Sequence, residues 1–233
     1  MEKYQIKPYG DAALIIQFEQ KIDPSVLKEV TAVTRSIRNA GITGIRDCIP
    51  AYASLTVNYD PLIVSFGDLK QKIMSLGTEE ISTEQEQRRI EIPVLYGTPF
   101  PEDLAHVAEH AGMSTEEVIA LHTSVDYPVY MIGFLPGFPY LGNLDPRLHT
   151  PRRKEPRTEI PAGAVGIGGA QTGVYPVTSP GGWHILGITP LKLYDPDAEE
   201  PVLLKSGDLV RFCSIDQETY DRILREGTAC TSR

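Results

Sequence analysis

The stretch GAVGIGGAQTGVYPVTSPGGWHILGIT, residues 163–189, decides the fold class of the larger part of this chain. Its short apolar runs alternate with Gly and Pro, which interrupt helices and mark tight turns. Similar runs surround it from Tyr127 onward: YPVYMIGF, LKLYD and DLVRFCSI. Many short strands separated by turn residues are typical of β-barrels and sandwiches. The sequence therefore predicts a compact β-barrel over residues 89–233.

The residues before this region alternate strands with amphipathic helices. Two strands are predicted around PYGD within residues 4–18 and two more around GIRDCIP and ASLTVNY. Between the pairs, Asp23 has the position of a helix N-cap, Pro24 the first helical position and Gly41 that of a C-terminal stop. A second helix is predicted near residues 66–76. The order ββαββα predicts a small α/β sandwich over residues 1–80.

A polar segment, GTEEISTEQEQRR, separates the two patterns and predicts a linker at residues 81–88. The second domain then opens on the strand RIEIPVLYG and two short helices, of which the second carries the Ser114–Glu117 pair of a capping box. A final helix is predicted from Asp216, with Tyr220, Ile223 and Leu224 facing inward. The fold class is therefore α+β, with an α/β sandwich followed by a β-barrel.

Charge and cysteine content exclude several classes of function. The 233-residue chain has a net charge of −9, and its one basic block is RRKEPR at 152–157, so binding to a nucleic acid backbone is not expected. MEKYQIKPYG lacks the apolar core of a signal peptide, and no apolar run approaches membrane-spanning length. Three cysteines without CxxC spacing indicate a reducing compartment. These features predict a cytoplasmic protein without a membrane partner.

Common catalytic signatures are missing from the sequence. GAVGIGG lies in a strand pattern rather than before a helix, and the chain has neither a GxxxxGK[ST] loop nor a GxSxG elbow. His106 and His110 lie at i, i+4 on a predicted helix, but without further ligands they are better explained as two solvated histidines than as a metal site. Catalytic residues are therefore left unassigned, and no metal is expected.

The stretch GFLPGFPYLG, residues 133–142, places three aromatic side chains on a segment that Gly and Pro make stiff. Polar residues gather in similar Gly- and Pro-rich connections nearby. Together they predict a pocket for a small, polar, anionic molecule, with Arg157 at its charged end. The predicted substrate-binding residues are His122, Phe134, Phe138, Tyr140, Arg153, Arg157, Gln171, Tyr175 and Ser179. The alternative is that Phe134 and Phe138 close the barrel core, with Trp183 and His184 as structural residues.

Three long motifs resemble the bacterial family of 5-oxoprolinase B subunits, also known as KipI and as allophanate hydrolase subunit 1. They are PYGDAALIIQF at 8–18, HTSVDYPVYMIGFLPGFPYLG at 122–142 and TPRRKEPRTEIPAGAVGIGGAQTGVYPVTSPGGWHILGITP at 150–190. The resemblance runs essentially from end to end. The same region is similar to part of the carboxyltransferase region of biotin-dependent urea carboxylase.

This resemblance implies a cyclophilin-like barrel and a role as one subunit of a hydrolase complex. With 5-oxoprolinase subunits C and A, the complex would open 5-oxoproline to L-glutamate using ATP, with Mg²⁺. Because this chain has no recognisable phosphate-binding loop, it is expected to be inactive alone, and the subunit that binds ATP is left unassigned. One alternative is a regulatory inhibitor that binds a sporulation sensor histidine kinase and blocks its autophosphorylation. A weaker alternative is a carboxyltransferase-like subunit acting on urea or a related amide.

Overall fold

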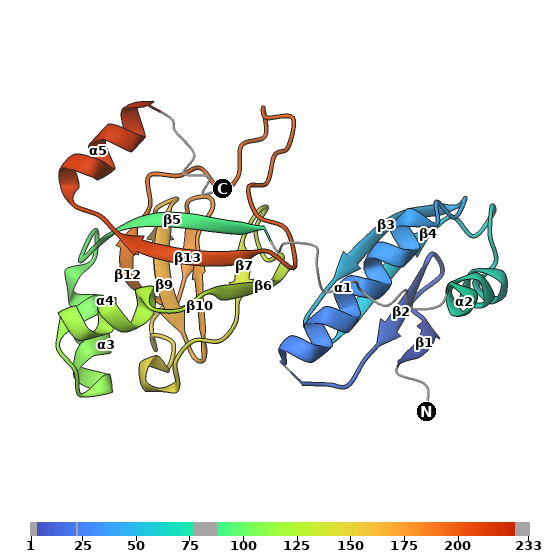
Figure 1. Cartoon of the computed structure of the whole chain (residues 1–233), viewed down its shortest axis with the longest axis horizontal. Helices are drawn as coiled ribbons and strands as arrows, with labels where there is room; N and C mark the ends of the chain where they lie inside the picture. The colour runs from blue at the N-terminus through green and yellow to red at the C-terminus, as the bar shows by residue number, and fades with distance from the viewer. Residues whose placement is uncertain (1–3, 22, 77–87, 227–233) are drawn as a thin grey trace. The chain divides into compact units, whose positions relative to one another are not determined.

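A computed structural model describes residues 4–21, 23–76 and 88–226 of the chain (Figure 1). The chain divides into two compact units, residues 1–86 and 87–233. Residues 81–87 of the predicted linker lie outside the described residues. The domain bounds expected from the sequence therefore stay a prediction, and each unit is described by itself.

The first unit is a four-stranded antiparallel sheet with two helices, in the predicted order ββαββα. The strand order is β1-β2-β4-β3. Its elements are β1 (Gln5–Pro8), β2 (Ala13–Gln17), α1 (Pro24–Asn39), β3 (Ile45–Pro50), β4 (Ser54–Tyr59) and α2 (Phe66–Ser75). α1 lies across β3 and β4 in Figure 1, and its apolar face packs with the sheet in one hydrophobic core.

The ends of α1 follow from its local sequence. Asp23 accepts a hydrogen bond from the backbone N–H of Ser25 at 2.8 Å, and Pro24 begins the helix. Its missing N–H costs nothing there, because the first N–H groups of a helix have no partner within it. Gly41, with φ 54°, follows the C-cap Ala40. These predicted helix signals are confirmed.

The second unit is a closed barrel with helices around it, which confirms the predicted fold class. Its elements are β5 (Arg89–Tyr96), α3 (Pro101–Ala111), α4 (Thr115–Thr123), β6 (Tyr127–Ile132), β7 (Pro139–Leu141), the 3₁₀ turn η1 (Pro146–Leu148), β8 (Arg157–Ile160), β9 (Ala164–Gly168), β10 (Gln171–Val174), β11 (Ser179–Gly181), β12 (His184–Ile188), β13 (Leu209–Ser214) and α5 (Gln217–Glu226). The predicted capping box of α4 is present, because Ser114 and Glu117 exchange side-chain and backbone hydrogen bonds.

The barrel closes in the strand order β10-β7-β6-β13-β5-β12-β9. β13 runs parallel to β5, while the other described strand pairs of the barrel are antiparallel. β8 and β11 pair with each other in a separate two-stranded sheet. β5, the first strand after the predicted linker, therefore lies beside β13, the last strand of the barrel.

The glycine-rich strand β9 separates two hydrophobic clusters. Successive side chains of a strand point to opposite faces, and on β9 Val165 and Ile167 belong to the barrel core while Ala164 belongs to a second cluster. Gly168 is required by this second cluster, because a Cβ atom there would lie 2.3 Å from Nε1 of Trp183. The pattern GAVGIGG thus forms a buried strand with large residues on one face and small ones on the other.

Two predictions of secondary structure and orientation need correction. LKLYD, residues 191–195, forms an isolated bridge between Tyr194 and Val202 rather than a strand. The final helix is present as α5, but none of its residues is buried and Leu224 is 59% exposed. Its amphipathic spacing is real, yet the barrel is closed without it. Among the described residues, no helix is long and apolar enough to cross a membrane.

Candidate functional site

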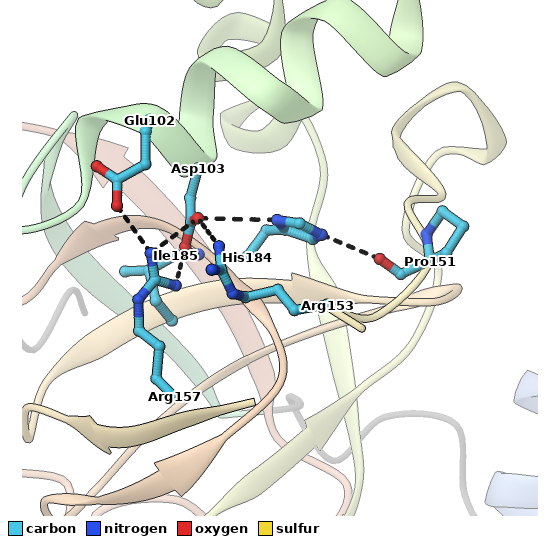
Figure 2. Close-up of polar contacts among 7 residues, drawn as sticks. All are labelled: Glu102, Asp103, Pro151, Arg153, Arg157, His184 and Ile185. Atoms are coloured by element: carbon cyan, nitrogen blue, oxygen red, sulfur yellow. Dashed lines mark hydrogen bonds and ion pairs between the residues drawn. The ribbon is translucent and has the colours of Figure 1, made fainter. Parts of the chain in front are cut away.

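Among the described residues of the second unit, several charged side chains surround Asp103 on the first turn of α3. Carboxylates are favoured near a helix N-terminus, where unpaired N–H groups carry partial positive charge. Asp103 is only 1% exposed, although charged side chains are almost never fully buried unless they are paired. Its partners come from the basic block of the sequence and from the start of β12 (Figure 2). We call Glu102, Asp103, Arg153, Arg157 and His184 the Asp103 cluster.

Four hydrogen bonds hold the Asp103 carboxylate. Its Oδ1 accepts from Nη1 of Arg153 at 2.8 Å and from Nη2 of Arg157 at 3.0 Å. Its Oδ2 accepts from Nη1 of Arg157 at 2.6 Å and from the backbone N–H of Ile185 at 2.8 Å. Nη2 of Arg157 also donates to the exposed Glu102 at 2.8 Å. Arg157 therefore uses the planar fork that distinguishes Arg from Lys.

The surroundings of Asp103 keep it ionised. Burial alone would raise the pKa of its carboxyl, but the interactions with the His184 ring, the Arg157 guanidinium and the Ile185 N–H outweigh burial. They hold the pKa of Asp103 well below its ordinary value of 3.8. The carboxylate is thus a fixed negative charge whose acceptor positions are already used. It is poorly suited to serve as a general base, which must be free to take a proton.

Aromatic and imidazole rings border the Asp103 cluster. The guanidinium of Arg157 lies 3.9 Å from the centroid of the Phe100 ring, in cation–π geometry. Nε2 of His184 donates to the carbonyl oxygen of Pro151 at 3.0 Å, because a carbonyl can only accept, and the other ring nitrogen lies 3.8 Å from Asp103. The His184 ring stacks on His106 at 4.6 Å. His106 and His110, predicted as two solvated histidines, therefore have a third imidazole ring next to them, the buried ring of His184.

A second group of predicted site residues forms a buried aromatic cluster. Phe138 and Tyr175 are each 2% exposed, and their rings meet edge to face at 5.3 Å. Trp183 contacts both rings in the same way, and Tyr140 packs against Phe138 at 5.1 Å. Burial raises the pKa of Tyr175 to about 12. This aromatic cluster also includes Ile160 of β8 and Ala164 of β9. Because Val165 of β9 belongs to the barrel core, the aromatic cluster lies on the opposite face of that strand.

The two clusters adjoin at β12 and at the β8–β11 sheet. The side chain of Ile185 belongs to the aromatic cluster, while its backbone N–H donates to Asp103. Arg157 pairs in register with Gly181, where a Cβ atom would lie 2.4 Å from the hydroxyl of Tyr175. A shift of Asp103 or of the β8–β11 sheet would therefore reach the aromatic rings directly.

His122 lies apart from both clusters, in the barrel interior with no exposed surface. Its Nε2 contacts the Thr172 hydroxyl at 2.8 Å, and that hydroxyl donates to the carbonyl of Gly166 at 3.1 Å. The hydroxyl must therefore accept from Nε2–H, which leaves Nδ1 to accept from the Tyr96 hydroxyl at 2.7 Å. Sequence analysis predicts His122 in the substrate pocket, but here both ring nitrogens are used in the interior.

Replacing His122 by Gln is expected to flatten the pH dependence of stability. Burial lowers the pKa of His122 from 6.5 to about 3, so between these values the unfolded chain binds a proton that the folded chain does not. Wild-type stability should therefore fall as the pH decreases from 6.5 toward 3, by about 1.4 kcal/mol per pH unit for one proton. Gln has no titrating proton, and it can accept from Tyr96 and donate to Thr172 as His122 does.

The measurement is urea unfolding of both proteins at several pH values between about 4.5 and 6.5. It is followed by the fluorescence of Trp183, the only tryptophan, which reports on the second unit. The slope of the free energy of unfolding against pH is compared between the wild type and His122→Gln. The other histidines contribute equally to both slopes, so their effect cancels in the difference. Equal slopes would show that His122 does not remain neutral in the fold.

The remaining predicted residues are scattered around the aromatic cluster. Phe134 is 67% exposed and meets Phe138 edge to face at 5.6 Å. Gln171 opens β10 and is half-buried, whereas Ser179 opens β11 and is buried. Arg157 is not a free charged end of a pocket, because its guanidinium is paired with Asp103 and Glu102. The structure thus brings Arg153 together with Arg157, and Phe138 with Tyr140 and Tyr175.

Asp103, which organises the cluster, is not among the site residues predicted from the sequence. Its only local signal is spacing: Asp103 lies four residues before the buried Val107, hence on the apolar face of α3. A carboxylate on the buried face of a helix requires a cation, and RRKEPR is the one basic block available. That combination could have paired the two segments, but no sequence pattern specifies which arginines take part.

Most of the chain is similar to known proteins. Residues 4–204 match the family described as carboxyltransferase domain, subdomain C and D. The chain is 44% identical to the 5-oxoprolinase B subunit of Bacillus subtilis, covering 94% of this chain and 95% of that protein. It is 42% identical to the 5-oxoprolinase B subunit of Escherichia coli O157:H7, with coverages of 91% and 96%. The crystal structure of TTHA0988 superposes with a TM-score of 0.79 at 39% identity, covering 88% of this chain but 40% of that one.

Proposed function

The chain belongs to the carboxyltransferase domain, subdomain C and D family and, within it, to the 5-oxoprolinase B subunits, and from this membership we propose that it is the B subunit of an ATP-dependent 5-oxoprolinase. The observation that carries the proposal is the 44% identity to the Bacillus subtilis protein over nearly the full length of both chains. The chain is accordingly part of a hydrolase complex. Its companions in the complex are proposed to be subunits C and A.

The chemistry explains why ATP and several subunits are needed. The lactam carbonyl of 5-oxoproline is a poor electrophile, because its nitrogen donates electron density to it. Transfer of a phosphoryl group from ATP to the amide oxygen creates a leaving group. A first water then adds to the carbon, and the ring C–N bond breaks with the nitrogen leaving as the amine, which gives γ-glutamyl phosphate. A second water hydrolyses this acyl phosphate to glutamate and phosphate. Mg²⁺ with ATP would neutralise the phosphate charge at the level of the complex.

We propose that this chain supplies binding and positioning rather than the reacting groups. Two of its buried titratable side chains are already used: the Asp103 carboxylate accepts four hydrogen bonds, and both nitrogens of His122 are engaged. Neither is free for proton transfer, which supports the expectation that the chain is inactive alone. Of the nine predicted substrate-binding residues, Phe134, Tyr140, Arg153, Arg157 and Gln171 keep some exposed surface and are the ones that a ligand could reach.

The test is an assay of glutamate release from 5-oxoproline with ATP, using the purified proteins. We expect no turnover by this chain alone, turnover by the three subunits together, and loss of at least about 99% of that rate when this chain is omitted. Adding back the Bacillus subtilis B subunit serves as the matched positive control, since it is 44% identical. Unchanged turnover without this chain would contradict the proposal.

The carboxyltransferase description of the family supports one competing function, carboxylation of urea or a related amide. The same preparations should therefore be incubated with urea, bicarbonate and a biotin-carboxylase partner. Carboxylated urea without glutamate release would assign this alternative. If the chain inhibits a sensor histidine kinase and supports neither glutamate release nor urea carboxylation, it would be assigned as a regulatory inhibitor.

A further inference from the structure

The loop before β7 holds Phe134 in a fixed and unfavourable backbone conformation. The backbone N–H of Leu135 donates to the carbonyl of Gly133 at 2.8 Å, which forms a γ-turn with Phe134 at its centre and φ 67°. γ-turns with positive φ are rare and strained for residues other than Gly. Two further backbone bonds, Phe138 to Leu135 and Gly133 to Phe138, both at 3.0 Å, close the loop. Phe134 is therefore presented rigidly.

The side chain of Phe134 is also unusually exposed to solvent for a large apolar residue. Phe134 is 67% exposed, although its neighbour in the motif, Phe138, is 2% exposed. A glycine would fit the positive φ without strain and would leave no apolar ring in water. Local strain at a functional site is often linked to the function. The pairing of strain with an exposed aromatic ring thus indicates a contact outside the described fold.

A hairpin with an acidic tip begins beside this loop. Tyr194 and Val202 form a bridge, and Leu203 N–H donates to Leu193 O at 3.0 Å, so residues 193–203 fold back as a hairpin. Its base contacts the loop, because a Cβ atom on Gly137 would lie 3.2 Å from both Leu193 O and Tyr194 Cβ. The turn carries four carboxylates and is flanked by two lysines: Asp195, Asp197, Glu199, Glu200, Lys192 and Lys205. Lys192 pairs with Asp195 and Lys205 with Glu200, which leaves an excess of two negative charges.

We propose that Phe134 and the acidic turn at 195–200 form a docking surface for another polypeptide chain, whose own surface offers an apolar pocket rimmed by Lys or Arg. A rigid aromatic side chain is suited to anchor such a contact, because little conformational entropy is lost on binding. The negative charge on the tip of the adjoining hairpin matches a basic rim and steers association. The partner is proposed to be the companion C subunit, so the inference rests on the proposed function.

The comparison with TTHA0988 supports a protein rather than a small molecule as the occupant. The region similar to this chain makes up only 40% of that chain. The same unit thus exists next to a larger amount of polypeptide in one molecule. In a separate chain, a surface that contacts such additional polypeptide would be left exposed.

The test measures the dissociation constant between the full chain and the purified C subunit by calorimetry, for the wild type and for Phe134→Gly. Gly removes the ring and relieves the strain, so its melting temperature should equal or exceed that of the wild type. We expect its affinity to fall about 30-fold or more, the range of interface hot spots. The double variant Asp197→Lys/Glu199→Lys should weaken binding about tenfold, mainly through slower association. Leu224→Ala, at a similarly exposed apolar position on α5, is the matched control and should bind as the wild type does.

The following results would overturn the docking surface. An affinity of Phe134→Gly within about threefold of the wild type would overturn it. Such a change is smaller than a tenfold loss, which is about 1.4 kcal/mol, whereas an interface anchor should contribute more than that. A loss of turnover with unchanged affinity, at saturating concentrations of the C subunit, would assign Phe134 to the substrate pocket instead. Equal losses in Phe134→Gly and Leu224→Ala would show that the effect is not local. Absence of binding by the wild type also overturns it, whereas a wild-type complex that binds but releases no glutamate would contradict only the proposed function.

Discussion

Replacing Phe138 by Ala is expected to lower the free energy of unfolding of the second unit by about 3–5 kcal/mol, the cost of removing a large buried aromatic side chain. Phe138 is 2% exposed and touches four aromatic rings, those of Phe134, Tyr140, Tyr175 and Trp183. Its removal leaves a cavity bordered by rings that cannot collapse easily, because Ile160 of β8 and Ala164 of β9 pack in the same cluster. The measurement is urea unfolding followed by Trp183 fluorescence.

The same motif supplies the control for this experiment. Phe134 is the same residue type four positions earlier, but it is 67% exposed. Phe134→Ala keeps the backbone strain and should therefore cost no more than about 1 kcal/mol, chiefly from the lost ring contact. Similar losses in the two variants would show that the aromatic cluster is not a close-packed core. A stable Phe138→Ala variant with reduced turnover would instead favour the predicted pocket wall.

Replacing Asp103 by Asn is expected to lower the free energy of unfolding by about 3 kcal/mol, because it removes the buried counter-charge of Arg153 and Arg157 and leaves Arg157 paired only with the exposed Glu102. Arg157 is 14% and Arg153 30% exposed, so solvent can compensate only part of the loss. Glu102→Gln is the matched control on the same helical turn. Glu102 is 62% exposed, and its ion pair with Arg157 should contribute no more than about 1 kcal/mol.

The Asp103 variant also has a defined pH dependence. Because the pKa of Asp103 is lower in the folded than in the unfolded chain, its stabilising effect is complete above the ordinary value of 3.8 and is lost as the pH falls through the folded value. The difference in stability between wild type and Asp103→Asn should therefore stay constant from about pH 5 to pH 8 and narrow only below 3.8. A difference that changes between pH 5 and pH 8 would assign the effect to another group. An Asp103→Asn variant as stable as the wild type would show that the ion pairs of Asp103 contribute no net stability.

These results also change what is expected of Arg157. From the sequence, Arg157 is a ligand-binding residue whose loss would affect activity more than stability. In the structure its guanidinium forms two bonds to the buried Asp103 and one to Glu102. Arg157→Ala should therefore destabilise the second unit, and lost activity in that variant alone would not identify a substrate contact. Arg153, which is more exposed, is the better probe of binding.

Local patterns in the sequence determined the elements of both units. The Asp23–Pro24 start of α1, the capping box of α4 and the short Gly- and Pro-bounded strands of the second unit depend on interactions within a few residues. Such interactions can be read from spacing, because helix caps and turns are satisfied by neighbouring groups. The inward face assigned to α5 was wrong for Leu224, which is 59% exposed, although Tyr220 and Ile223 are half-buried. Amphipathic spacing shows which residues of a helix lie together, but not whether another element covers them.

The tertiary structure alone decided what the polar and aromatic residues do. Asp103 and Arg157 are 54 residues apart, and their pairing depends on where α3 and β8 meet around the barrel. The same closure placed His122 against Thr172 in the interior, and it sent Phe138 into a buried cluster while Phe134 remained outside. Composition and spacing identified GFLPGFPYLG and RRKEPR as unusual, but burial and charge pairing arise between distant segments. For this protein the sequence determined the elements and the family, whereas long-range packing determined which side chains remain free to bind.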